Sequence, residues 1–126
     1  MKIAIFENEY ESVRGAFDTA NLIDFDNQLK FSIFTSSQMA DFSLFIDFSA
    51  FFVDIDLSTK SVLDGFGVIQ KIKDTNQDLL RRIIILTGNN KIKEAMKERN
   101  IFDNRIQIII KPTDYMEITK SLRLIS

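Results

Sequence analysis

The chain has 126 residues, 45% of them hydrophobic, and a formal net charge of −2, which predicts one globular domain with a sizeable core. It contains no cysteine and no histidine. Disulfides, cysteine or histidine metal sites, cysteine nucleophiles and histidine-assisted serine catalysis are therefore excluded. The slightly acidic balance argues against direct nucleic-acid binding.

The first apolar run, residues 3–6, ends at the carboxylate of Glu7. It is too short for the core of a secretory signal. No other run approaches the roughly 18 apolar residues that a membrane span needs. We therefore expect a soluble, cytoplasmic protein that does not contact a membrane.

Short apolar runs alternate along the chain with segments of helical periodicity. The runs have the continuous apolar pattern of buried parallel strands and cover residues 3–6, 31–34, 51–53, 83–86 and 106–110. Apolar spacings of three and four predict amphipathic helices within residues 13–20, 66–72, 92–96 and 115–125. A further short helix is expected within residues 36–48, and Pro112 is expected at the start of the last helix. This alternation predicts an α/β fold with a five-stranded parallel sheet and helices on both faces.

Phenylalanine is unusually frequent, with 12 residues in the chain, most of them between Phe25 and Phe52. Large aromatic side chains contribute strongly to hydrophobic cores. The alternative, an aromatic ligand-binding cluster, has no group of polar residues nearby to support it. We interpret the phenylalanines as core.

Polar residues follow several predicted strands at the points where the strands end. In an open parallel sheet these ends meet at one edge, where ligands bind. Carboxylates there can hold Mg²⁺, a hydroxyl and an ammonium can bind phosphoryl oxygens, and a carboxylate can act as a nucleophile. The residues are Glu7, Asn8, Glu9, Asp54, Thr87, Gly88, Lys111 and Pro112.

This set of residues, in this order, resembles the receiver domain of two-component response regulators. The resemblance covers essentially the whole chain and is strongest in residues 2–9, 52–66, 83–88 and 108–112. It implies a flavodoxin-like, doubly wound sheet with strand order 2-1-3-4-5. It also implies that residues 1–126 form a single domain with no output domain.

The resemblance implies a role for each residue at the predicted phosphoryl site. Asp54 matches the phosphoacceptor, Thr87 the hydroxyl residue that bonds the phosphoryl group, and Lys111 the lysine that contacts it. Gly88 would keep the neighbourhood of Asp54 open. Pro112 matches the proline commonly found after the lysine, often through a cis bond.

The resemblance also implies a magnesium site. Glu7 and Asn8 match the acidic pair that binds Mg²⁺, together with Asp54 and the backbone carbonyl of Asp56. Asn8 is an amide where the family usually has a carboxylate, so the affinity for Mg²⁺ should be lower unless Glu9 turns inward. A role for Asn8 in capping a helix is the competing interpretation.

Two further positions depart from the family pattern. Ser58 replaces a usual proline in the loop that follows the phosphoacceptor, and this loop is about two residues longer than usual. Ile108 occupies the place of the aromatic switch residue on the fifth strand. Together with Asn8, both departures bear on whether Asp54 is phosphorylated. Ile108 also bears on whether Thr87 is coupled to the face formed by the fourth and fifth strands.

We therefore expect a phosphorelay receiver that accepts a phosphoryl group from a histidine kinase or a histidine phosphotransfer protein. It would act on a downstream protein partner and could form a homodimer. We expect no enzyme activity beyond autophosphorylation from a phosphodonor. The alternative is a degenerate receiver that works as a phosphorylation-independent interaction module. A flavodoxin-like nucleotide or flavin binder is opposed by the acidic loop at residues 7–11, which would repel phosphate.

Overall fold

Five parallel strands form the centre of the molecule, in the order β2-β1-β3-β4-β5. The computed structural model describes residues 1–125. The strands lie within one residue of their predicted bounds and are β1 (Lys2–Phe6), β2 (Lys30–Phe34), β3 (Ala50–Asp54), β4 (Ile83–Thr87) and β5 (Gln107–Ile110). The predicted doubly wound, flavodoxin-like sheet is confirmed.

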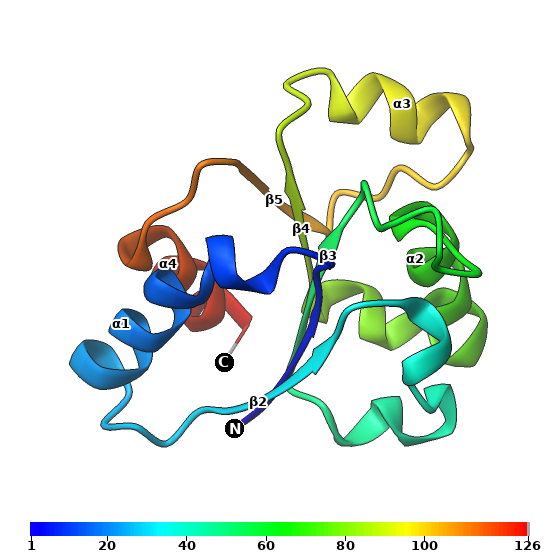
Figure 1. Cartoon of the computed structure of the whole chain (residues 1–126). Helices are drawn as coiled ribbons and strands as arrows, with labels where there is room; N and C mark the ends of the chain where they lie inside the picture. The colour runs from blue at the N-terminus through cyan, green and yellow to red at the C-terminus, as the bar shows by residue number, and fades with distance from the viewer. Residues whose placement is uncertain (126) are drawn as a thin grey trace.

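The helices cover both faces of this sheet (Figure 1). One face carries α1 (Arg14–Asp24), which follows the short 3₁₀ helix η1 (Tyr10–Ser12), and α4 (Tyr115–Ile125). The other carries α2 (Gly65–Thr75), α3 (Ile92–Glu98) and the 3₁₀ helix η4 (Gln77–Arg82). No helix within residues 1–125 is long and apolar enough to cross a membrane.

Alternating side chains of each strand build two separate cores. Ile3 and Ile5 of β1 pack with the residues of α1 and α4, whereas Ala4 and Phe6 pack toward α2. This is the period of two that a β-strand imposes. Because both faces are buried, each central strand is apolar throughout, which is why the strands were predictable from short runs.

The segment between β2 and β3 differs from the prediction. It contains two 3₁₀ helices, η2 (Ser37–Met39) and η3 (Phe42–Asp47), where one short α-helix was expected. Ala40 has extended backbone angles, and the side chain of Asp41 accepts a hydrogen bond from the amide of Ser43. Such local side-chain bonds compete with α-helix formation.

Phe42, Phe45 and Phe48 lie three residues apart, and this spacing fits the three residues per turn of a 3₁₀ helix. Their rings therefore reach the same core. The centroids of Phe42 and Phe45 are 4.5 Å apart, and those of Phe45 and Phe51 are 5.0 Å apart. The interpretation of the phenylalanines as core is confirmed for this cluster.

The last helix begins later than expected. α4 starts at Tyr115, and the side chain of Asp114 accepts a hydrogen bond from the amide of Glu117. The prediction that Pro112 lies at the helix start was wrong. Pro112 instead follows a cis peptide bond from Lys111.

Candidate functional site

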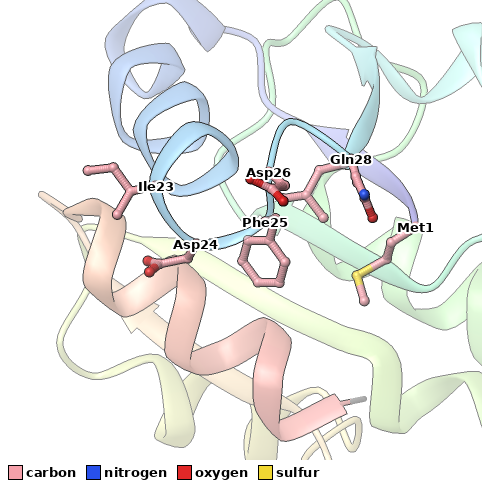
Figure 2. A pocket seen from close by; sticks show the side chains of 7 residues that line it. Met1, Ile23, Asp24, Phe25, Asp26 and Gln28 are labelled. Carbon is pink, nitrogen blue, oxygen red and sulfur yellow. The ribbon is translucent and has the colours of Figure 1, made fainter.

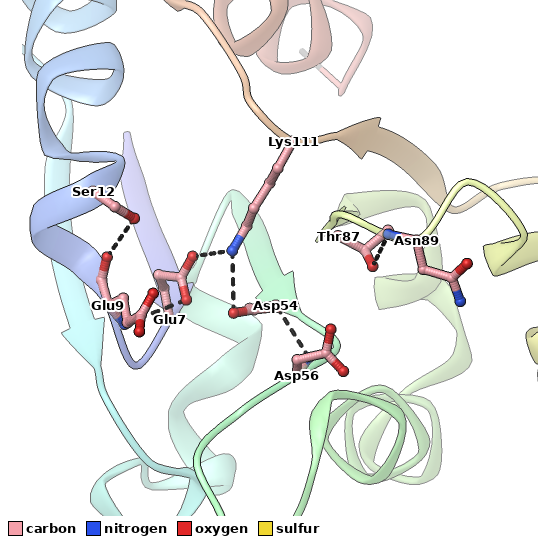
Figure 3. A network of polar contacts seen from close by, with 8 residues as sticks. All are labelled: Glu7, Glu9, Ser12, Asp54, Asp56, Thr87, Asn89 and Lys111. Atoms are coloured by element: carbon pink, nitrogen blue, oxygen red, sulfur yellow. Dashed lines mark hydrogen bonds and ion pairs between the residues drawn. The ribbon is translucent and has the colours of Figure 1, made fainter.

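Two carboxylates and one ammonium meet at the carboxyl end of the sheet (Figure 3). The Nζ of Lys111 donates a hydrogen bond to Oε1 of Glu7 and another to Oδ2 of Asp54, the latter 3.2 Å long. Glu7 is fully buried and Asp54 is 4% exposed. We call Glu7, Asp54 and Lys111 the acidic–lysine triad.

The register of the strands brings these three side chains together. Phe6 of β1 pairs with Val53 of β3, so the next residues, Glu7 and Asp54, lie side by side. The amide of Lys111 donates to the carbonyl of Thr87 with a length of 2.7 Å, which fixes the chain after β5 against the end of β4. β4 lies between β5 and β3, so only a long side chain such as lysine reaches Asp54 from there (Figure 3).

The electrostatics of the triad favour a proton on Glu7. Burial raises the pKa of Glu7 to about 7, and the neighbouring Asp54 raises it too, against the lowering effect of Lys111. Burial alone would lower the pKa of Lys111, but its bond to Glu7 and the charge of Asp54 outweigh burial and raise it. The net charge of the triad therefore changes by one unit near pH 7, as Glu7 titrates.

A pH-dependent stability follows from Glu7. Its pKa rises from 4.5 to about 7 on folding, so the stability it contributes is complete below pH 4.5 and is lost as the pH rises to about 7. We expect Glu7→Gln to remove this loss. Urea unfolding of both proteins from pH 4.5 to 8 should show the wild type losing up to roughly 3 kcal/mol relative to the variant. Parallel pH curves would contradict the buried, titrating Glu7.

Asp54 is also held by the loop that follows it. The amide of Asp56 donates to Oδ1 of Asp54 with a length of 2.9 Å, so each oxygen of Asp54 accepts one bond. Asp56 makes this contact through its N–H, and its side chain is exposed. The predicted role of its carbonyl in a metal shell stays a prediction.

Thr87 lies at the end of the adjacent strand and is fully buried. Its Oγ1 accepts a hydrogen bond from the amide of Asn89, 3.1 Å long. Within residues 1–125 this hydroxyl makes no hydrogen bond to a side chain of the triad, and Thr87 contacts Lys111 through its backbone carbonyl. Sequence reasoning missed Asn89. The available signal was the hydroxyl two residues before it, since threonine often accepts from the amide at that spacing.

The other predicted positions lie around the triad. A side chain at Gly88 would meet nothing within 4 Å, so there is open space at this point. Ile108 is half-buried and packs on the core at the α2 face, without the ring that a receiver switch residue usually has.

The side chains of Glu7, Asn8 and Asp54 carry oxygen atoms, which are the ligand type that a hard divalent cation prefers, but only two of the three are carboxylates. Within residues 1–125 no group of three or more aspartate, glutamate, histidine or cysteine side chains is arranged to hold a metal. Asn8 is half-buried beside Glu7, and the residue that precedes η1 as its cap is Glu9, so the capping interpretation of Asn8 was wrong. Glu9 is exposed and contacts Glu7 only through its amide.

A pocket lies far from the triad, at the amino ends of β1 and β2 (Figure 2). Its volume is about 520 Å³, and its lining includes Met1, Ile23, Asp24, Phe25 and Gln28. Catalytic and ligand groups of open parallel sheets gather at the opposite, carboxyl ends of the strands. The triad is therefore the better candidate site.

No protein-family model matches the sequence, and no curated protein sequence is significantly similar to it. Solved structures do match. The receiver domain of NtrX from Brucella abortus has a TM-score of 0.70 at 21% identity, covering 98% of this chain and 97% of that one. A receiver domain from Rhodospirillum rubrum has a TM-score of 0.66 at 18% identity, covering 98% and 89%.

A third structure is the receiver domain of the sensor histidine kinase PA1611 from Pseudomonas aeruginosa. Its TM-score is 0.68 at 18% identity, covering 98% of this chain and 96% of that one. That structure has a magnesium ion coordinated in its active-site cleft. The fold of this chain is thus that of response regulator receiver domains, as the sequence resemblance predicted.

Proposed function

We propose that this chain is a phosphorelay receiver that accepts a phosphoryl group on Asp54 and then presents a changed surface to a downstream protein. The donor would be a histidine kinase or a histidine phosphotransfer protein. The observation that carries the proposal is a buried aspartate bonded by Lys111, beside Glu7, at the carboxyl edge of a receiver fold.

In this proposal Asp54 acts as the nucleophile. One carboxylate oxygen attacks the phosphorus of a phosphohistidine, and the new P–O bond forms as the P–N bond breaks. The imidazole leaves with the bonding electron pair and takes up a proton. The amide of Asp56 orients the Asp54 carboxylate for this attack.

Lys111 and Thr87 would bind the transferred group. An ammonium has three N–H donors, and within the described chain Lys111 uses two of them on Glu7 and Asp54. The third is left for a phosphoryl oxygen. The hydroxyl of Thr87 accepts from Asn89, so its own hydrogen remains to be donated in the same way.

Four oxygen ligands would hold Mg²⁺. They are the carboxylates of Glu7 and Asp54, the side-chain amide oxygen of Asn8 and the backbone carbonyl of Asp56. The metal, when bound, supplies positive charge that neutralises the phosphoryl oxygens. With an amide at position 8 we expect weak binding. The contacts that Thr87 and Lys111 make with the phosphoryl group would shift the populations of two packings of residues 88–91 and α3.

The test uses small-molecule phosphodonors, because the partner is unidentified. With Mg²⁺ and acetyl phosphate, wild-type protein should gain the mass of one phosphoryl group, and beryllofluoride should shift the amides of Asp54, Thr87 and Lys111. Asp54→Asn should do neither. Asp56→Asn is the matched control, because it removes an exposed carboxylate and keeps the amide that contacts Asp54.

A wild-type protein with no mass gain and no amide shifts at high Mg²⁺ would overturn the proposal. It would leave the phosphorylation-independent interaction module as the interpretation of this fold.

A further inference from the structure

The long loop between β3 and α2 is held by two residues from a distant segment. The amide of Ser37 donates to Oγ of Ser61, and Oγ of Ser37 accepts from the amide of Leu63, each 2.8 Å long. The side chain of Gln38 accepts from the amide of Val62 at 2.9 Å and donates to the carbonyl of Lys60 at 2.8 Å. We call these four bonds, made by Ser37 and Gln38, the loop clasp.

The loop clasp involves a buried residue and several hydrogen bonds, unlike an isolated contact on the surface. Ser37 is 2% exposed, although it is a polar residue in a connecting segment. The backbone N–H and the hydroxyl oxygen of Ser37, as well as both ends of the Gln38 side-chain amide, bond to the loop. Ser37 and Gln38 therefore satisfy three backbone groups of the loop that no strand or helix pairs, the carbonyl of Lys60 and the amides of residues 62 and 63.

At its other end, next to β3, the same loop contacts Asp54. Asp56, at the start of the loop, donates its amide to Asp54. At the base, the amide of Gly65 donates to the carbonyl of Ile55, 3.1 Å long. Between these points the loop has Ser58 where a proline would have restricted the backbone. Hydrogen bonds within the loop also join residues 58, 60, 61 and 63, and the loop clasp adds the bonds that join this outer half to the segment after β2.

We infer that Ser37 and Gln38 are positioning residues of the Asp54 site, holding the β3–α2 loop so that the Asp56 backbone stays on Asp54. The inference rests on the proposed function for its ligands, Mg²⁺ and a phosphoryl group. It assigns a role to η2, the segment where a 3₁₀ turn replaces the expected α-helix.

Local opening of a surface loop costs less free energy than global unfolding, even where some of its side chains, here Leu57 and Leu63, pack on the core. Removing the bonds that one side chain makes should raise the open population about fivefold to tenfold. In the open loop the Asp56 peptide is no longer fixed beside Asp54. The affinity for any ligand that needs both groups should then fall by a comparable factor.

The experiment compares Gln38→Ala and Ser37→Ala with the wild type. Gln38 is exposed, so its truncation leaves the core intact even if the buried Ser37 does not tolerate alanine. Matched controls are Gln70→Ala, which removes a half-buried glutamine bonded to Asp74, and Ser43→Ala, which removes an exposed serine bonded to Asp41.

Two readouts are needed for each protein. The first is amide hydrogen exchange at Asp56 and residues 60–63 without ligand, which we expect to be about fivefold to tenfold faster in both clasp variants and unchanged in both controls. The second is the affinity for Mg²⁺ with beryllofluoride, which we expect to fall by a similar factor in the clasp variants alone.

Unchanged exchange at Asp56 in both clasp variants would overturn the inference, whether or not the site binds its ligands. Faster exchange with unchanged affinity would overturn it as well, since the clasp would then be merely structural. A wild-type protein that binds neither Mg²⁺ nor beryllofluoride would refute the proposed function, and with it the ligand half of the inference. Exchange at Asp56 would still decide whether the clasp holds the loop.

Discussion

Replacing Lys111 with methionine should destabilise the folded protein by about 3 kcal/mol at pH 8, because it leaves two buried carboxylates facing each other without a cation. Glu7 is fully buried and Asp54 is 4% exposed, so water cannot fully replace the lost ammonium. Methionine keeps the apolar stem, which separates the loss of charge from the loss of packing.

The cost should depend on pH in a defined direction. Without Lys111, the effect that lowers the pKa of Glu7 is gone, so this pKa should rise above 7. At pH 5 Glu7 is then protonated and its repulsion with Asp54 disappears, which should reduce the loss to about 1 kcal/mol. Chemical unfolding at pH 5 and pH 8 measures the difference.

The double variant Lys111→Met with Glu7→Gln tests the cause. It removes one of the two carboxylates and should recover most of the stability lost at pH 8. Lys120→Met, an exposed lysine of α4, is the matched control and should change stability by less than about 0.5 kcal/mol. Equal losses at both pH values, or no recovery in the double variant, would show that the triad is not electrostatically coupled.

The strands and the gathering of Glu7, Asp54 and Lys111 could be predicted for one physical reason. Strands buried on both faces must be apolar throughout, so the first polar residue after each run marks the end of a strand. Because parallel strands end at one edge, these polar residues had to be neighbours. Predicting that these three residues lie together therefore required only the positions of the strands, and not those of the helices or loops.

The loop clasp could not be predicted in this way. Ser37 and Gln38 act on residues 24 or more positions away for three of the four bonds, and neither lies in a periodic pattern. The segment around them contains serines and phenylalanines with no strong α-helix preference, so its 3₁₀ form was decided by packing on the Phe6 and Phe51 side of the sheet.

Among the four glycines, Gly65 is the one where an added methyl group should most disturb both the fold and the site. An added Cβ would lie 2.4 Å from the carbonyl oxygen of Asp54 and 2.4 Å from Cα of Ile55. Both are backbone atoms, so no side-chain rotation relieves the clash. The start of α2 or the end of β3 must move instead.

We expect Gly65→Ala to destabilise the protein by about 3 kcal/mol, at the upper end of overpacking effects, as measured by urea unfolding. The shift of β3 should also displace Asp54 and lower beryllofluoride binding in the protein that remains folded. Gly15→Ala is the matched control, because a Cβ at Gly15 in α1 meets nothing within 4 Å. It should stabilise the helix by about 0.5–1 kcal/mol. If both variants were equally stable, the close approach of α2 to β3 would not be a constraint on the site.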